Sequence, residues 1–581
     1  MIKGTELLVK ALREEGVDTL FAYPGGQAID IFDALYGQED IEVIMPRHEQ
    51  ALVHAADGYA RSTGKTGVCL VTSGPGATNL VTGVATANYD SVPLVCFTGQ
   101  VPLSLMGNDA FQEVDIVGIT NPVCKYCVTV RKREELGRII KEAFYIARSG
   151  RPGPVIVDLP KDIQNALGSD EYPETVNIRG YKPNEGVHAG QIKKVVGVLK
   201  KAKKPLFLAG GGVNISGACE SFEKLVEFTG IPVITTIMGK GAISCQNKHY
   251  LGNIGIHGSY AANHAVNECD VLFSIGTRFN DRITGKISEF APNATIIHID
   301  VDPASISKNI AVDIPVVADA KLAIDTLFEY MPKLNVSKWL DRTLEWKKEY
   351  PVTMSKHKGL TPEKVIRYIN DNFDAPIVTT DVGQNQLWTT QYFEPEGHGK
   401  LLTSGGLGTM GYGFPAAIGA KIGNPDKTVI SISGDGGIQM NIQEFATAIV
   451  YELPIIIVVF NNGYLGNVRQ WQELFYERRY SSTCLRYRKS CDKNCISCNA
   501  ASRNTDEKEC PKYTPDFVKL AESYEAHGIR IFNEDKIKKA FDYALEFKKG
   551  PTLIECIIER EANVYHMVPT GRSLSEIIMD C

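Results

Sequence analysis

VISISGDGGIQMNIQEFATAIVYELPIIIVVFNN, residues 429–462, is the stretch that decides the fold. Its first four residues and the run IIIVVF near its end are rich in β-branched side chains, which is typical of strands buried on both faces. Between them, Ile442, Phe445 and Ile449 recur at helical spacing, so one helix is expected within residues 438–453. The stretch therefore predicts a strand–helix–strand unit with parallel strands.

Polar residues follow both strands of this unit. Asp435 comes after the first strand and Asn462 after the second, and the carboxyl ends of parallel strands meet at one ligand-binding edge. One carboxylate and one amide oxygen suit Mg²⁺, while Gly436 and Gly437 let a diphosphate approach the backbone. A lone Gly-Asp-Gly is more often a plain strand-to-helix turn. Together with the asparagine on the next strand, it resembles the diphosphate and metal motif of thiamine-diphosphate enzymes.

Composition places the chain among ordinary globular proteins. Its 581 residues are 44% hydrophobic and 22% charged, and the length predicts three or four domains. The net charge of −6 gives no reason to expect a nucleic-acid partner. No segment has the pattern of a membrane span, a signal peptide or a transit peptide, so a cytoplasmic location is expected.

Strand and helix patterns alternate along the whole chain. They predict an α/β protein with three consecutive doubly wound parallel-sheet domains, at 1–168, 190–335 and 360–581, separated by polar linkers. The expected strands are residues 19–22, 41–45, 67–72, 93–98, 205–209, 233–236, 271–275, 295–300, 376–380, 429–432 and 455–460.

Glu49 stands between a predicted strand and a predicted helix. On its own, it could simply be an acidic residue that interacts favourably with the helix dipole. Thiamine chemistry offers a second interpretation, because a buried carboxyl group must hold a proton against the aminopyrimidine ring. A carboxyl with a raised pKa in a dry pocket suits that role.

Several motifs in the first domain resemble one family. They are Tyr23–Gly26, Arg47–Gln50, Ser73–Asn79, Phe111–Asp115, Gly150–Pro154 and Asp158–Asp162. They are similar to the pyrimidine-binding domain of the acetolactate synthase (acetohydroxyacid synthase) family. The resemblance implies that Glu49 activates thiamine diphosphate, that Gln112 lies near the reaction centre, and that Lys161 lies at the substrate channel. It also implies cofactor contacts from Gly26, Thr72, Pro75 and Asn79.

The middle domain has glycines at strand ends and Asp300 after a strand, as a dinucleotide site requires. This spacing alone fits a purely structural domain equally well. The family resemblance implies FAD, bound for structure rather than for redox chemistry, and it implies that Arg282 meets the carboxylate of the second substrate. The implied flavin contacts are Arg151, Gly210, Gly211, Gly212, Thr236, Met238, His257, Gly276, Thr277, Arg278, Arg282, Asp300, Val301 and Asp319.

The third domain completes the resemblance. It implies Mg²⁺ ligands from Asp435, Asn462 and the main-chain carbonyl of Tyr464. Trp471 would lie in the substrate pocket, on a mobile loop, and residues 562–569 would form a C-terminal lid. The implied thiamine-diphosphate contacts are Val382, Gly383, Gln384, Asn385, Gly408, Met410, Gly434, Gly436, Gly437 and Asn467.

Five positions depart from the family pattern. Gln27, Asn280, Asn385, Gly437 and Asn467 stand where the family usually has Ala, Asp, His, Ser and Met. A more polar pocket or altered proton handling is one interpretation, and neutral drift is the other.

An insertion at 483–514 holds five of the 14 cysteines. They are Cys484, Cys491, Cys495, Cys498 and Cys510. Their spacing and basic neighbours suit a zinc or iron–sulfur site, with free or disulfide-forming thiols as the alternative.

The sequence as a whole predicts an acetolactate synthase catalytic subunit. It would decarboxylate pyruvate on thiamine diphosphate and condense the hydroxyethyl unit with pyruvate or 2-oxobutanoate, in branched-chain amino acid biosynthesis. A homodimer or dimer of dimers is expected, with a small regulatory subunit as a further partner. The alternatives are a related 2-oxo acid decarboxylase or oxidase, and a degenerate regulator that only binds the cofactor.

Overall fold

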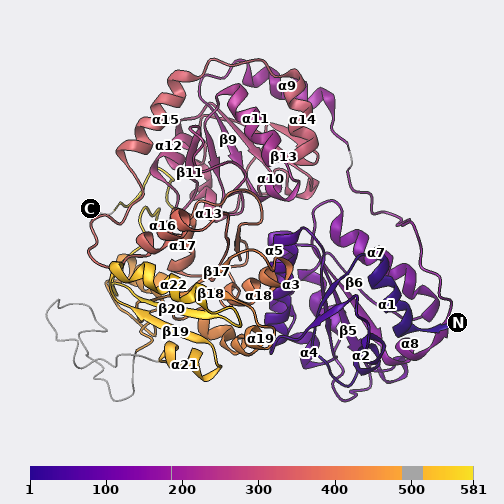
Figure 1. The fold of residues 1–581 in the computed structure, drawn as a ribbon. Helices are drawn as coiled ribbons and strands as arrows, with labels where there is room; N and C mark the ends of the chain where they lie inside the picture. Colours follow the sequence, from indigo (N-terminus) through magenta and orange to yellow (C-terminus); the bar gives the residue numbers. More distant parts are fainter. Residues whose placement is uncertain (185, 487–514, 580–581) are drawn as a thin grey trace.

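The computed structural model describes residues 1–184, 186–486 and 515–579 (Figure 1). It contains three sheets of six parallel strands, one in each third of the chain. Apolar clusters cover both faces of the sheets, as the N-terminal sheet illustrates. The predicted fold class is therefore confirmed, while the exact domain boundaries stay a prediction.

The N-terminal and C-terminal sheets have the same strand order. In space, the N-terminal sheet runs β3 (Glu42–Ile44), β2 (Thr19–Ala22), β4 (Gly67–Val71), β5 (Leu94–Gln100), β7 (Pro154–Pro160) and β6 (Tyr126–Thr129). The C-terminal sheet runs β16 (Leu401–Thr403), β15 (Ile377–Thr380), β17 (Val429–Gly434), β18 (Ile455–Asn461), β20 (Thr552–Ile557) and β19 (His527–Ile531). Numbered from the first strand of each sheet, both orders are 2-1-3-4-6-5.

The middle sheet has a different order. It runs β11 (Tyr250–Asn253), β10 (Val233–Thr235), β9 (Pro205–Ala209), β12 (Val271–Ile275), β13 (Thr295–Asp300) and β14 (Ile314–Val317). Numbered in the same way, this order is 3-2-1-4-5-6, which is the arrangement of dinucleotide-binding sheets. A short antiparallel pair, β1 (Ile2–Lys3) with β8 (Leu167–Gly168), joins the two ends of the N-terminal domain.

Helices flank each sheet. The N-terminal domain has α1 (Gly4–Glu14), α2 (Ile29–Leu35), α3 (Glu49–Thr63), α4 (Pro75–Thr78), α5 (Val81–Asp90), α6 (Ile116–Thr120), α7 (Leu136–Arg148) and α8 (Lys161–Asn165). The middle domain has α9 (Ala189–Leu199), α10 (Gly211–Ile215), α11 (Cys219–Thr229), α12 (Tyr260–Glu268), α13 (Asp281–Thr284), α14 (Ala320–Tyr330) and α15 (Ser337–Glu349). The C-terminal domain has α16 (Pro362–Asn372), α17 (Gln384–Tyr392), α18 (Gly413–Gly423), α19 (Phe445–Val450), α20 (Gly466–Phe475), α21 (Phe517–Ser523) and α22 (Ile537–Glu546).

Helices α3 and α18 join the N-terminal and C-terminal domains (Figure 1). Glycines allow their backbones to touch. A Cβ atom on Gly58 would lie 2.1 Å from the carbonyl oxygen of Ala416, and one on Gly419 would lie 1.7 Å from that of Ala55. No larger residue fits either position without moving one domain away from the other.

The helix expected within residues 438–453 is present but divided. The segment forms a 3-10 helix at Ile438–Glu444, followed by α19. Asn441 breaks the helical geometry with φ −134° and ψ 38°, and its side-chain amide donates to the carbonyl oxygen of Gly411 at 2.7 Å. A side chain that serves a distant loop therefore divides the helix.

The linker between the second and third domains belongs partly to the middle-domain core. Helix α15 buries Trp339 and Trp346 there, and the Trp339 indole N–H donates to the carbonyl oxygen of Pro205 at 3.0 Å. Val568 and Leu574, near the end of the chain, join the same apolar cluster. Among the described residues, no helix combines the length and apolar character that crossing a membrane requires.

Candidate active site

The predicted pyrimidine-side residues meet at the carboxyl edge of the N-terminal sheet. Glu49 is the first residue of α3, after His48, whose ring nitrogen accepts the backbone N–H of Gln50 at 3.1 Å. The Glu49 carboxylate accepts a hydrogen bond from the amide of Asn79 at 2.9 Å. A Cβ on Gly76 would lie 3.5 Å from its other oxygen. The half-buried carboxylate is thus fixed in orientation above a glycine-rich turn.

Further predicted residues surround this edge. The Lys161 ammonium donates to the carbonyl oxygen of Gly26 at 2.8 Å, and the Thr72 hydroxyl accepts the backbone N–H of Gln27 at 3.2 Å. Gln112 has a positive φ of 60° and lies against the glycine-rich turn, because a Cβ on Gly74 would be 2.9 Å from its carbonyl oxygen. The structure therefore brings together the residues predicted on this side.

Asp435 is the buried acid of the C-terminal edge. Its carboxylate accepts the backbone N–H of Gly463 at 2.8 Å and that of Gly436 at 3.2 Å. Burial raises its pKa to about 7, and these backbone donors limit the rise. A carboxylate in this setting gains from a bound cation, which favours its charged form.

Asn462 lies over the same turn. Its carbonyl oxygen accepts the backbone N–H of Tyr464 at 3.1 Å, and its amide donates to Gln384 at 3.1 Å. One carboxylate, one amide and a main-chain carbonyl leave room for waters and phosphate oxygens, so these residues fit Mg²⁺. In residues 1–184, 186–486 and 515–579, no group of three or more His, Cys, Asp or Glu side chains could hold a metal ion.

Some of the predicted diphosphate contacts lie near the Asp435 turn, while Val382, Gly408 and Asn467 line a separate cavity. Val382 and Gly383 follow β15, and Met410 lies 3.6 Å from the position of a Cβ on Gly436. Asp381 was not singled out from the sequence, but its buried carboxylate accepts the backbone N–H groups of Gly411 at 3.0 Å and Gly413 at 3.2 Å. It ties the loop before α18 to the end of β15.

A cavity of about 650 Å³ opens where the three domains meet. Most of the predicted flavin contacts line it, while Gly210 and His257 do not. Those that do are Arg151, Gly211, Gly212, Thr236, Met238, Gly276, Thr277, Arg278, Arg282, Asp300, Val301 and Asp319.

At this cavity, glycines allow two backbone segments to approach each other closely, as a dinucleotide site requires. A Cβ on Gly212 would lie 2.6 Å from the Cα of Gly276, and one on Gly210 would lie 2.2 Å from the Gly276 carbonyl oxygen. The volume and the exposed backbone fit FAD. The Asp319 carboxylate caps α14 by accepting the N–H groups of Lys321 and Leu322, so it positions that helix.

A second cavity, of about 1190 Å³, is lined by two of the predicted acceptor-side residues, Arg282 and Trp471, but not by Gln112 or Lys161. The guanidinium carbon of Arg282 lies 6.0 Å from the centre of the Trp471 ring. This geometry leaves the planar guanidinium beside an apolar wall, which suits a small 2-oxo acid. Asn467, His257, Val382 and Gly408 also line the cavity.

The departures from the family pattern have structural roles of several kinds. The Asn385 amide donates to the carbonyl oxygens of Asp381 at 2.8 Å and Ile432 at 3.2 Å, so it connects the ends of β15 and β17. A Cβ on Gly437 would lie 2.4 Å from the Asp381 carboxylate, so a serine would require that carboxylate to move. Asn467 and Asn280 line the second cavity.

The predicted cysteine site lies almost entirely outside the described residues. Cys484 is described, and it forms an antiparallel bridge with Tyr464. Cys491, Cys495, Cys498 and Cys510 fall within residues 487–514, outside the described part of the chain. That hypothesis stays a prediction.

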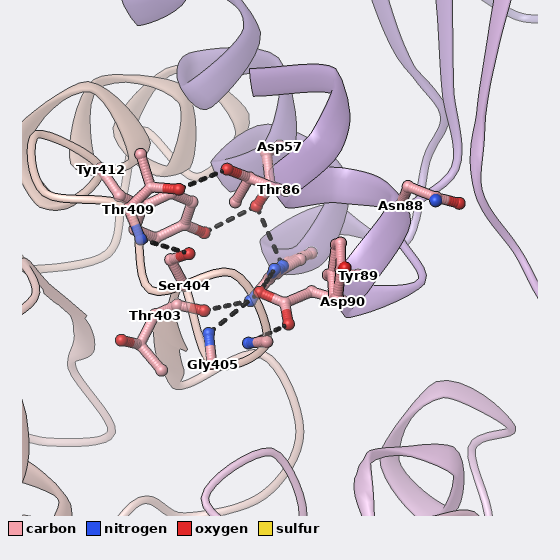
Figure 2. Close-up of polar contacts among 12 residues, drawn as sticks. Asp57, Thr86, Asn88, Tyr89, Asp90, Thr403, Ser404, Gly405, Thr409 and Tyr412 are labelled. Carbon is pink, nitrogen blue, oxygen red and sulfur yellow. Dashed lines mark hydrogen bonds and ion pairs between the residues drawn. The ribbon is translucent and has the colours of Figure 1, made fainter. Parts of the chain in front are cut away.

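Sequence reasoning missed a buried ionic network beside the flavin cavity (Figure 2). The Arg61 guanidinium pairs with Asp57 at 2.9 Å and with Asp90 at 2.8 Å, and the Tyr412 hydroxyl donates to Asp57 at 2.6 Å. The four-residue spacing of Asp57 and Arg61 on one helix was an available signal. No sequence pattern indicated the partners on other elements, Asp90 and Tyr412.

Comparison with known proteins agrees with this geometry. Three family descriptions match: thiamine pyrophosphate enzyme N-terminal TPP binding domain at 2–119, central domain at 192–327, and C-terminal TPP binding domain at 381–556. A probable acetolactate synthase large subunit of Methanocaldococcus jannaschii is 46% identical, covering 99% of this chain and 95% of the relative. The acetolactate synthase isozyme 3 large subunit of Escherichia coli K12 is 41% identical, covering 99% and 98%. The acetolactate synthase large subunit of Haemophilus influenzae is 42% identical, covering 100% and 98%.

The chain belongs to the acetolactate synthase large-subunit family. The predicted family is confirmed, and with it the predicted enzyme class, a thiamine-diphosphate-dependent carboligase. The matched domains also confirm thiamine diphosphate among the predicted cofactors. Full-length coverage of acetolactate synthase relatives favours a catalytic subunit over the degenerate regulator.

Proposed function

We propose that this chain decarboxylates pyruvate and joins the remaining two-carbon unit to a second 2-oxo acid, as the catalytic subunit of an acetolactate synthase in branched-chain amino acid biosynthesis. One carbon–carbon bond breaks with release of CO₂, and one forms to the carbonyl carbon of the acceptor, so no oxidant is consumed. The observation that carries the proposal is the pair of half-sites, Glu49 and Asp435, on two sheets of the same strand order.

Thiamine diphosphate, once bound, supplies a nucleophilic carbon and stabilises the charge left by decarboxylation. Glu49 holds a proton against the aminopyrimidine ring, with Asn79 fixing the carboxylate at 2.9 Å. Asp435, Asn462 and the Tyr464 carbonyl would hold Mg²⁺, which would neutralise the charge of the diphosphate. The C-terminal turn thus anchors the cofactor, and the N-terminal helix activates it.

The acceptor side uses the second cavity. Arg282 binds the carboxylate of the incoming 2-oxo acid, since a guanidinium matches a carboxylate in shape and charge. Trp471 provides the apolar wall beside it. Gln112 and Lys161 line the approach from the N-terminal edge. Arg151, Arg278 and the middle-domain glycines would hold FAD in the first cavity, as a structural group.

The complete site requires a second copy of this chain. Neither cavity described above is lined by Glu49 or Asp435. Large apolar side chains are exposed beside both half-sites: Phe111, next to Gln112, is 84% exposed, and Met440, after the Asp435 turn, is 54% exposed. Exposed apolar groups of this kind favour a protein interface. We therefore place Glu49 of one copy against Asp435 of the other.

Complementation between two inactive variants tests this arrangement. Glu49→Gln and Asp435→Asn, co-expressed, should regain about a quarter of the normal activity, because half of the dimers are hybrids and each hybrid has one intact site. No recovery in hybrids isolated with two different tags would overturn the shared site. Each variant expressed alone serves as the matched control.

Product analysis tests the function itself. The purified chain, incubated with pyruvate, Mg²⁺, thiamine diphosphate and FAD, should release 2-acetolactate, and added 2-oxobutanoate should give 2-aceto-2-hydroxybutyrate. Acetaldehyde or acetyl phosphate without acetolactate would indicate the decarboxylase or oxidase alternative. Absence of turnover would favour the regulator.

The relatives are named as large subunits, and a small regulatory subunit is the corresponding partner. Addition of such a subunit from a related organism should raise activity or make it sensitive to an amino acid.

A further inference from the structure

The end of helix α5, residues 88–91, is a junction of the three domains. Figure 2 shows its contact with the C-terminal domain, between Asp90 and Gly405. On one side it meets two arginines that line the flavin cavity. Arg151 donates to the Asn88 carbonyl oxygen at 2.9 Å and to the Ser91 hydroxyl at 2.8 Å. Arg278, from the middle domain, donates to the Tyr89 carbonyl oxygen at 2.5 Å. Groups that contact the flavin cavity therefore also hold this helix end.

On its other side the junction holds a loop of the C-terminal domain. The Asp90 carboxylate accepts the backbone N–H of Gly405 at 3.0 Å and that of Gly406 at 2.8 Å. The same carboxylate pairs with Arg61 at 2.8 Å, and its side chain is 0% exposed. Hydrogen bonds to a buried charged group are among the stronger ones in proteins, so the position of Asp90 sets the position of this loop.

Arg61 extends this contact to the base of the loop. Its guanidinium donates to the carbonyl oxygen of Thr403 at 2.8 Å, and its second partner, Asp57, accepts the Tyr412 hydroxyl. Burial works most strongly against the positive charge of Arg61, but Asp57, Tyr412 and Asp90 together outweigh it, and the pKa of Arg61 is raised. Both ends of the loop, residues 404–412, are thus bound to the N-terminal domain.

This loop lies between the two ligand sites. Gly405 and Gly406 line both the flavin cavity and the acceptor cavity. A Cβ on Gly405 would lie 2.3 Å from the sulfur of Met238, one of the predicted flavin contacts. Further along, the loop carries Met410, which reaches the Asp435 turn at Gly436. A shift of the loop would therefore change the geometry of both sites.

We propose that Asp90 is a positioning residue through which FAD and thiamine diphosphate strengthen each other's binding. This rests on the proposed function, which assigns FAD to the first cavity. FAD orders the arginines at the end of α5, Asp90 transmits that order to residues 404–412, and thiamine diphosphate then binds a loop that is already in place. The free energy of ordering is spent once for two ligands, which is positive coupling. By linkage, the effect on the two affinities is equal.

A binding cycle on the full chain tests the coupling. FAD affinity is measured by flavin fluorescence, with and without thiamine diphosphate and Mg²⁺. In the unmodified protein, FAD should bind about tenfold more tightly when thiamine diphosphate is present, and in Asp90→Asn this factor should fall below about twofold. An unchanged factor in Asp90→Asn, or no coupling in the unmodified protein, would overturn the proposal.

The matched control is Asp40→Asn. Asp40 pairs with Arg13 at 2.6 Å on the surface, where both side chains are about half exposed. The Asp40→Asn substitution removes one carboxylate from an ion pair, as Asp90→Asn does. The coupling between FAD and thiamine diphosphate should nevertheless remain as in the unmodified protein.

A second variant and a second measurement guard against a folding defect in Asp90→Asn. Gly406→Ala keeps the Asp90 charge but places a Cβ 2.8 Å from its oxygen, so it should weaken the coupling as well. In the unmodified protein, FAD alone should slow hydrogen exchange of the amides in 404–412. Unchanged exchange there would contradict the proposal. Failure of the unmodified chain to bind FAD or thiamine diphosphate would instead contradict the proposed function.

Discussion

The N-terminal and C-terminal domains use one strand order for two different tasks. In each, the second strand leads into a helix at the domain interface: β3 leads to α3, and β16 leads to α18. The connection in the N-terminal domain spans residues 45–48, and α3 begins directly at Glu49. The connection in the C-terminal domain spans residues 404–412. The longer connection is the loop that Asp90 holds.

This difference separates two ways to build a site on one fold. In the N-terminal domain, the start of a helix sets the position of Glu49, so local structure suffices. In the C-terminal domain, Asp435 follows a central strand, while the neighbouring loop depends on another domain for its position. Function therefore follows from what is attached to the strand ends rather than from the fold.

Of the substitutions that test this difference between the two domains, Glu49→Gln should have the largest effect on the reaction rate. The substitution keeps an acceptor for Asn79 but removes the acid, so acetolactate formation should fall by about 1,000-fold. Thiamine-diphosphate binding should stay as in the unmodified protein, since the proposed anchors of the cofactor lie in the C-terminal domain. Steady-state kinetics measures the rate of acetolactate formation, and a fluorescence titration measures the affinity for thiamine diphosphate. A rate within about tenfold of normal would rule out the role of Glu49 as the acid.

Asp435→Asn should have the converse effect. Loss of the only carboxylate among the proposed ligands should weaken Mg²⁺ binding by about 100-fold in the presence of thiamine diphosphate. Calorimetry measures the affinity, and saturating Mg²⁺ should restore part of the rate. Glu49→Gln is the matched control, because it should leave Mg²⁺ affinity unchanged. Equal Mg²⁺ affinity in both variants would contradict the division of tasks.

The sequence was informative where function depends on strand ends. Parallel strands end at one edge, so Asp435 and Asn462 could be placed together from their order alone, and the structure places both at the 462–464 turn. Runs of β-branched residues likewise located the buried strands.

The remaining features depend on contacts between distant segments. Asp90 and Gly405 are 315 residues apart in sequence, and nothing in either local stretch indicates that they meet. The break in the helix at Asn441 has the same origin, because the partner of its side chain, Gly411, lies 30 residues away. Local pattern predicts elements, while pairing of polar groups across domains requires the fold itself.

Gly419→Ala should disturb the interface that relates the two domains. The added Cβ would overlap the carbonyl oxygen of Ala55, so we expect a loss of about 2 kcal/mol in the free energy of unfolding. Gly197→Ala is the control. Gly197 lies in helix α9 with open space around its Cβ position, so the change should stabilise by about 0.5–1 kcal/mol. Urea unfolding measures both, and a neutral Gly419→Ala would show that α3 and α18 can separate without loss.

One buried acid in each of the two domains should make the stability of the protein depend on pH in the same direction. This is the smallest of the expected effects. Burial raises the pKa of Asp158 to about 6 and that of Asp381 to about 6. In each case the folded protein keeps the proton that the unfolded chain loses near pH 4, so this contribution to stability is present below pH 4 and is lost as the pH rises to 6. Asn stays neutral throughout. Asp158→Asn should therefore gain about 1 kcal/mol relative to the unmodified protein between pH 4.5 and 5.5. Asp381→Asn should shift with the same sign. Urea unfolding of each variant and of the unmodified protein at the two pH values measures this difference. If the stability of the variant relative to the unmodified protein fell as the pH rose, the raised pKa values would be contradicted.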